Sequence, residues 1–267
     1  MQPTNRWRIR ISGICKLPGK MCDVSALGET TLRLIESRLK DNSGNELLLR
    51  AERHCRKIEV SLASNRRKEA VQSWILSELD YTYHEEQMLV EATFSDYQNL
   101  HDILERLSKA LAVGQQEEVD IDILECIYWR RGALLYMYCN TVNKHPDKQT
   151  DQYTDCLSKG IQELSAMLSV RTRPKGAESQ DEQTQKLLEE GIFSDTHVLA
   201  LMYAGEMCYW LLTHSEPSDT SQHTQLVKQC HHFLTTYIFV TEGPLKLHGW
   251  STDRAKQILS QVVNQKT

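Results

Sequence analysis

The stretch Glu125–Cys139, ECIYWRRGALLYMYC, decides the fold, because most of its residues are apolar or aromatic. Wound at 3.6 residues per turn, it carries apolar groups on nearly every side, which is typical of a helix buried at the centre of a protein. A second stretch, Val198–Leu212 (VLALMYAGEMCYWLL), has the same character. We therefore predict that both stretches form helices and that these two helices pack together in the core.

Each of these stretches carries charge in its middle. Arg130 and Arg131 lie in the first, and Glu206 lies in the second. Because an unpaired buried charge is costly, we expect Glu206 to form a core ion pair with one of the arginines. The alternative is that one arginine faces a groove and binds the carboxylate of a partner.

Small residues stand beside the charges in both stretches. A glycine inside a helix costs about 1 kcal/mol relative to alanine, so it usually has a packing reason. Close approach of the two helix backbones would be such a reason, and it would bring Glu206 within reach of an arginine. The residues expected in this contact are Trp129, Gly132, Ala133, Ala204, Gly205 and Trp210.

Composition limits the class of protein. Of the 267 residues, 40% are hydrophobic and 25% are charged, which is enough for a sizeable core and ordinary for a soluble protein. The net charge of -5 argues against a nucleic-acid binder, which would need a basic face. The eight dispersed cysteines form no CxxC pair, which favours free thiols in a reducing compartment. No run reaches the roughly 18 apolar residues of a membrane span, so we expect any membrane association to be indirect.

Helical periodicity recurs along most of the chain, and no alternating β-branched strands interrupt it. We predict an all-α protein, a single irregular bundle or array of about nine helices. The helical domain should cover residues 23–267, with polar loops near 143–153, 171–182 and 214–224. Residues 1–22 contain five basic and no acidic residues. A mitochondrial presequence would share that composition but should be helical, so a flexible basic arm is favoured.

A search for reactive groups finds no phosphate-binding glycine loop and no nucleophile elbow. His84-Glu85-Glu86 lacks the second histidine of a zinc-binding HExxH motif, because position 88 is Met. Cys230-His231-His232 is the densest set of metal-ligand types, but neighbours on a helix point about 100° apart and cannot all face one ion. We therefore expect no catalytic residue, cofactor or metal ion.

Several stretches together resemble one known family. They are Leu124–Cys139 (LECIYWRRGALLYMYC), Gly191–His197 (GIFSDTH), Met202–Trp210 (MYAGEMCYW), Glu242–Lys246 (EGPLK) and Ala255–Leu259 (AKQIL). They are similar to the Rab-seven-interacting subunit of the Mon-one–Ccz-one complex, and the similarity covers most of the chain from about residue 45. The arm at 1–22 and the loops at 143–153 and 214–224 depart from that pattern.

The resemblance implies a non-catalytic function. Members of that family associate with the late-endosomal Rab GTPase and with its heterodimeric exchange factor, and they support Rab stability and its recruitment to damaged mitochondria in mitophagy. It implies a cytosolic protein that is recruited to mitochondria or late endosomes. Two other hypotheses stay open: an enzyme whose active site joins Arg130 or Arg131 to His197 or Glu206, and a membrane binder acting through the basic arm.

Overall fold

A computed structural model describes residues 22–89, 97–145, 151–171, 180–214 and 220–264. The basic arm expected at 1–22 falls outside the described residues except for Cys22, and so do parts of the three expected polar loops. The described residues contain ten α-helices and one short 3-10 helix, where the sequence predicted about nine helices. The prediction of an all-α array is confirmed.

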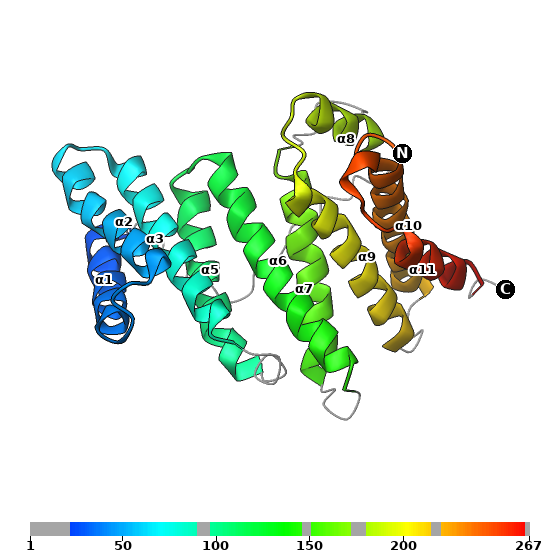
Figure 1. Cartoon of the computed structure of the whole chain (residues 1–267), viewed down its shortest axis with the longest axis horizontal. Coiled ribbons are helices and arrows are strands. Elements are labelled where there is room, and N and C mark those ends of the chain that lie inside the picture. Colours follow the sequence, from blue (N-terminus) through cyan, green and yellow to red (C-terminus); the bar gives the residue numbers. More distant parts are fainter. Residues whose placement is uncertain (1–21, 90–96, 146–150, 172–179, 215–219, 265–267) are drawn as a thin grey trace.

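The helices lie side by side along the long axis of the molecule, from α1 at one end to α11 near the other (Figure 1). Their bounds are α1 (Val24–Asp41), α2 (Glu46–Ala63), α3 (Arg67–Gln87), α5 (Tyr97–Gln116), α6 (Ile121–Asn143), α7 (Asp151–Ser169), α8 (Gln180–Glu189), α9 (Asp195–His214), α10 (Thr220–Glu242) and α11 (Asp253–Asn264), with the 3-10 helix η2 at Lys246–His248.

Capping side chains fix several of the helix ends. Asp23 precedes α1 and accepts a hydrogen bond from the backbone N–H of Ala26, and Asn45 does the same for α2 through Leu48. Such caps satisfy backbone donors that have no partner within the helix. After α8, Gly191 adopts a φ of 68°, a left-handed conformation that glycine tolerates and that stops a helix.

The contacts between helices define two layers. Helices α3, α6, α9 and α11 touch one another in succession and form the first layer. Helices α5, α7 and α10 pack onto it, each against two members of the first layer. The two apolar stretches of the sequence therefore form α6 and α9, neighbouring helices of the same layer, with α7 packed against both (Figure 1).

One hydrophobic core runs through the array from α1 to α11. Among its fully buried members are Trp74 of α3, Leu134 of α6 and Leu164 of α7. A smaller cluster that includes Ile35 and Leu48 joins α1, α2 and α3 at the first end. The core is thus continuous along the array, and the array can hold a fixed shape over its whole length.

Candidate functional site

Helices α6 and α9 meet through a ladder of four aromatic rings. Trp129 stacks on Tyr203 with 6.0 Å between ring centroids, Tyr203 stacks on Tyr136 at 3.7 Å, and Tyr136 stacks on Trp210 at 5.5 Å. The ladder alternates between the two helices and connects both tryptophans. The two apolar helices meet through these rings, with Trp129 at one end of the ladder and Trp210 at the other.

The glycines of these helices do not face each other, so that part of the prediction is wrong. A Cβ added to Gly132 of α6 would meet the side chain of Leu164 in α7, and one added to Gly205 of α9 would meet Leu234 in α10. Each glycine makes room for a leucine of the helix that follows it in the chain. Their neighbours Ala133 and Ala204 are half-buried and buried, respectively.

The predicted ion pair between Glu206 and Arg130 or Arg131 is also wrong. Arg130 pairs with Glu86 of α3, and Arg131 pairs with Glu163 of α7 at 2.7 Å. The two arginines are adjacent in sequence and therefore point about 100° apart, toward two different helices. Neither side chain is directed at α9.

Glu206 forms its contacts elsewhere. Tyr136 of α6 donates a hydrogen bond of 2.6 Å to Oε2 of Glu206, and Arg254 of α11 donates one of 3.0 Å to Oε1. Burial raises the pKa of Tyr136, and the adjacent carboxylate raises it further. The phenol of Tyr136 therefore stays protonated. Glu206, on α9, accepts from this neutral donor of α6 and from the charged Arg254 of α11, and so joins the three helices.

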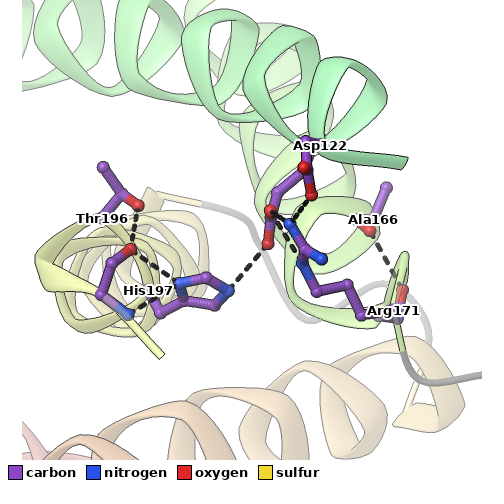
Figure 2. Close-up of polar contacts among 8 residues, drawn as sticks. Asp122, Ala166, Arg171, Thr196 and His197 are labelled. Atoms are coloured by element: carbon purple, nitrogen blue, oxygen red, sulfur yellow. Dashed lines mark hydrogen bonds and ion pairs between the residues drawn. The ribbon is translucent and has the colours of Figure 1, made fainter. Parts of the chain in front are cut away.

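A polar network at the start of α9 was not foreseen from the sequence (Figure 2). Nε2 of His197 lies 2.8 Å from Oε1 of Glu125, a residue of α6. Arg171, just after α7, donates to Oε2 of Glu125 from Nε at 2.9 Å and also bonds Asp122. The network thus holds together one end of α6, α7 and α9.

The hydrogen bonds of His197 fix its tautomer. The backbone N–H of Ser194 donates to Nδ1 at 3.2 Å, so Nδ1 is an acceptor and the ring proton lies on Nε2, toward Glu125. Burial raises the pKa of Glu125, but the neighbouring His197 and Arg171 outweigh it and hold that pKa below its ordinary value. Glu125 is therefore ionised at neutral pH.

Ser194, His197 and Glu125 are the residue types of a hydrolytic triad, but the arrangement is that of a helix cap. Ser194 precedes the first turn of α9, and His197, three residues later, returns a side-chain acceptor to its N–H. Nδ1 of His197 already accepts that backbone bond and also lies 3.0 Å from Oγ of Ser194. The sequence signal for this cap is the Ser at position 194 before the apolar stretch; the reciprocal bond is not signalled, because such boxes carry Glu or Gln where this chain has His197.

The structure does not form the active site proposed as an alternative. That hypothesis required Arg130 or Arg131 to meet His197 or Glu206. Instead, the arginines pair with Glu86 and Glu163, and the two other groups belong to separate networks at different positions along α9.

A cavity of about 390 Å³ opens beside His197, between α7, α8, α9 and α10. One wall is formed by α10 and carries Lys228 and His232. The facing wall mixes apolar side chains, among them Leu168, Leu187 and Leu201, with the polar Ser165, Ser169, Thr184 and His197. No aspartate or glutamate is among the described residues that line it. The size is within the range of protein ligand sites.

Other surfaces expose apolar side chains. Tyr83 and Met88 near the end of α3 are exposed, Met88 by 65%, and Met137 is exposed on α6. The guanidinium of Arg130 lies 4.7 Å from the centre of the Tyr83 ring. In η2, Leu247 is 99% exposed. Exposed apolar and aromatic groups of this kind are common in contacts with other proteins.

Side chains of the types that bind metal ions also occur in small clusters. In the part of the chain that is described, His101, Asp102 and Glu105 bring ligand atoms within 4.8 Å of one another, and all three are exposed on α5. In the Cys230-His231-His232 sequence of α10, Cys230 is buried and its thiol donates a hydrogen bond to the carbonyl oxygen of Gly205, whereas His231 is exposed. Burial raises the pKa of Cys230 to about 12, which leaves this thiol protonated.

No helix in the described ranges is both long enough and apolar enough to cross a membrane. The layered helices, the interhelical ion pairs and the exposed apolar groups define the class of an all-helical array protein.

Comparison with known sequences gives the particular family. Residues 49–262 match the family described as "RAB7A-interacting MON1-CCZ1 complex subunit 1", and the chain belongs to this family. A zebrafish (Danio rerio) relative of that name is 40% identical over 207 residues, which cover 68% of this chain and 74% of the relative. The mouse (Mus musculus) and human (Homo sapiens) relatives of that name are 37% and 35% identical, with the same shares covered. No solved structure matches the chain.

Proposed function

We propose that this chain is a non-catalytic interaction subunit that binds a Rab GTPase of the RAB7A type and the MON1–CCZ1 exchange factor. The observation that carries the proposal is the 40% identity to a RAB7A-interacting MON1-CCZ1 complex subunit over 207 residues. Identity of this extent includes both central helices, α6 and α9, so the scaffold is shared.

The physical features of the array agree with a binding role. Its continuous core and interhelical ion pairs keep the helices in fixed positions, so a partner meets a preorganised surface. The exposed Tyr83, Met88 and Leu247 offer the apolar and aromatic contacts that contribute most to binding between proteins. The charged groups of the core are occupied in holding helices together.

The proposal extends to cellular function. The chain acts in the cytosol and is recruited to late endosomes or damaged mitochondria through its partners, where it supports the stability of the GTPase and its recruitment during mitophagy. Residues 23–267 form the binding domain, and the arm at 1–22 is not needed for the protein contacts.

Affinity capture with purified components tests this function. The immobilised chain is offered the GTPase loaded with GDP or a GTP analogue, with and without the exchange factor. We expect capture in at least one of these combinations, and equal capture by a variant that lacks residues 1–22. Absence of capture in every combination would overturn the proposal, and loss of capture in the shortened variant would assign binding to the arm.

A further inference from the structure

We propose that the cavity between α7, α8, α9 and α10 binds an extended segment of a partner protein, about five residues long, that carries an acidic side chain beside an apolar one. This inference rests on the proposed function and assigns part of the partner contact to a particular place on the array.

The two walls of the cavity differ in chemistry. Along α10, the polar side chains at the cavity are Gln225, Lys228, Gln229, His232 and Thr236. Apart from the adjacent Lys228 and Gln229, each is three or four residues from the next, so the row lies along one side of the helix. The facing wall contributes apolar groups from α7, α8 and α9, among them Leu168, Leu187 and Leu201. The lining is completed by Phe233 of α10 and by the polar side chains Ser165, Ser169, Thr184 and His197 of the facing wall. A ligand therefore meets a row of polar groups along α10 and a mixture of apolar and polar groups opposite it.

A peptide segment suits both walls. A glutamine side chain offers both a donor and an acceptor, so Gln225 and Gln229 can bond the N–H and C=O groups of an extended backbone. Alternate side chains of an extended segment point to opposite sides, which directs one set toward the facing wall. An acyl chain has no hydrogen-bonding groups to offer the two glutamines, so it gains less from this wall than a peptide does.

The length of the polar row sets the length of the segment. Gln225 and Thr236 are eleven positions apart, and a helix rises 1.5 Å per residue, so the row is about 16 Å long. An extended chain advances about 3.3 Å per residue, so about five residues match the row. The volume of about 390 Å³ accommodates part of such a segment and leaves the rest at the rim.

Charge defines the acidic position. Lys228 is exposed at the cavity, and the lining within the described residues includes no carboxylate, although the chain as a whole has a net charge of -5. The site thus differs in sign from the protein around it. A carboxylate of the partner gains an ion pair with Lys228, and its approach is favoured by the charge complementarity.

Measured affinities of charge-reversal variants test the inference. The probes are the purified GTPase and exchange factor, together with twelve-residue peptides that tile their sequences. We expect Lys228→Glu to weaken binding of the partner that uses the cavity by about tenfold, and to weaken its acidic peptide similarly. The matched control is Lys186→Glu, which reverses an exposed lysine of α8 outside the lining and should leave the affinity within about twofold.

Two further variants separate recognition from general charge. Gln225→Ala combined with Gln229→Ala should weaken binding without a change in net charge. A peptide in which the acidic residue is replaced by lysine should bind the Lys228→Glu variant better than the wild type. Because the substituted residues are exposed or half-buried, melting temperatures should stay close to that of the wild type.

The outcomes distinguish the two proposals. If the wild type captures neither partner, the proposed function fails and this inference fails with it. If the wild type captures them and Lys228→Glu does so equally well, only the inference is overturned. Displacement of a bound peptide by oleate without any effect of the glutamine substitutions would identify the cavity as a fatty-acid site and would also overturn it.

Discussion

Two glutamates join the same pair of helices, α6 and α7, and they behave in opposite ways. Glu125 of α6 contacts Arg171 beyond the end of α7, and Glu163 of α7 pairs with Arg131 of α6. Their side chains have similar exposed surface, 12% and 15% respectively. Yet the pKa of Glu125 is below its ordinary value, and the pKa of Glu163 is above it.

The number of polar partners and the depth of burial together explain the difference between the two pKa values. Glu125 receives two hydrogen bonds from Arg171 and has His197 at its other oxygen. Burial raises the pKa of Glu163, and the positive charge of Arg131 opposes that rise without cancelling it. Two carboxylates with similar exposed surface thus differ: Glu125 has enough partners to outweigh its burial, whereas the deeper burial of Glu163 outweighs its pairing with Arg131.

Removal of Arg131, which pairs with Glu163, should have the largest effect. Arg131→Met leaves a buried carboxylate uncompensated, and we expect the free energy of unfolding to fall by about 3 kcal/mol at pH 7. The double variant Arg131→Met with Glu163→Met should recover most of that loss, because an apolar pair can replace a buried ion pair. Urea unfolding measures both, and a single variant as stable as the wild type would contradict the comparison.

The spacing of α6 and α7 underlies both contacts, and Gly132→Ala tests it. The added Cβ would lie 2.5 Å from a methyl carbon of Leu164, so the Leu164 side chain or the two helices must shift. Overpacking of this kind costs about 1–3 kcal/mol, of which the better helix propensity of alanine returns up to about 1. Gly44→Ala is the matched control, since nothing lies within 4 Å of its Cβ. Equal thermal unfolding of the two variants would refute close packing at Gly132.

Loss of one partner of Glu125 should cost less than loss of Arg131, the partner of Glu163 among the described residues. His197→Leu removes the contact with Glu125 and the acceptor for the N–H of Ser194, while Arg171 stays in place. We expect a decrease of about 1–2 kcal/mol in the free energy of unfolding. Urea unfolding should place the stability of this variant between those of the wild type and Arg131→Met. A variant less stable than Arg131→Met would contradict the proposed difference between Glu125 and Glu163.

The dependence of stability on pH should show the smallest effects, with opposite signs. The ordinary glutamate pKa is 4.5. Because the folded pKa of Glu125 is lower, its contribution is present above pH 4.5 and is lost as the pH falls through the folded value. Because the folded pKa of Glu163 is higher, its contribution is full below pH 4.5 and is lost as the pH rises through the folded value.

Glutamine variants measured between pH 3 and pH 7 separate these two contributions. Glu125→Gln should flatten the increase of stability with pH in the acidic range, whereas Glu163→Gln should make that increase steeper. Chemical unfolding at each pH gives the slopes. Slopes that change in the same direction in both variants would show that the two carboxylates have similar environments.

The apolar character of α6 and α9 could be predicted because residues such as Trp129 and Trp210 must leave water wherever the helices lie. Their contact followed from the same reasoning. The partners of Arg130, Arg131 and Glu206 could not be predicted. The sequence gives the side of the helix on which each charge lies, but the partner depends on which other helix packs against that side. The cavity beside α10 likewise needs four helices, and no single stretch of sequence contains its two walls.

The sequence by itself determined that this protein is an all-helical array with two apolar helices at its centre, and it carried the resemblance to an interaction subunit. Tertiary structure alone decided which helices are joined by Arg130, Arg131 and Glu206, which leucines pack against Gly132 and Gly205, and where the cavity opens. The physical reason is that periodicity and burial are local properties of a chain, whereas ion pairs and cavities depend on the distances between segments far apart in sequence.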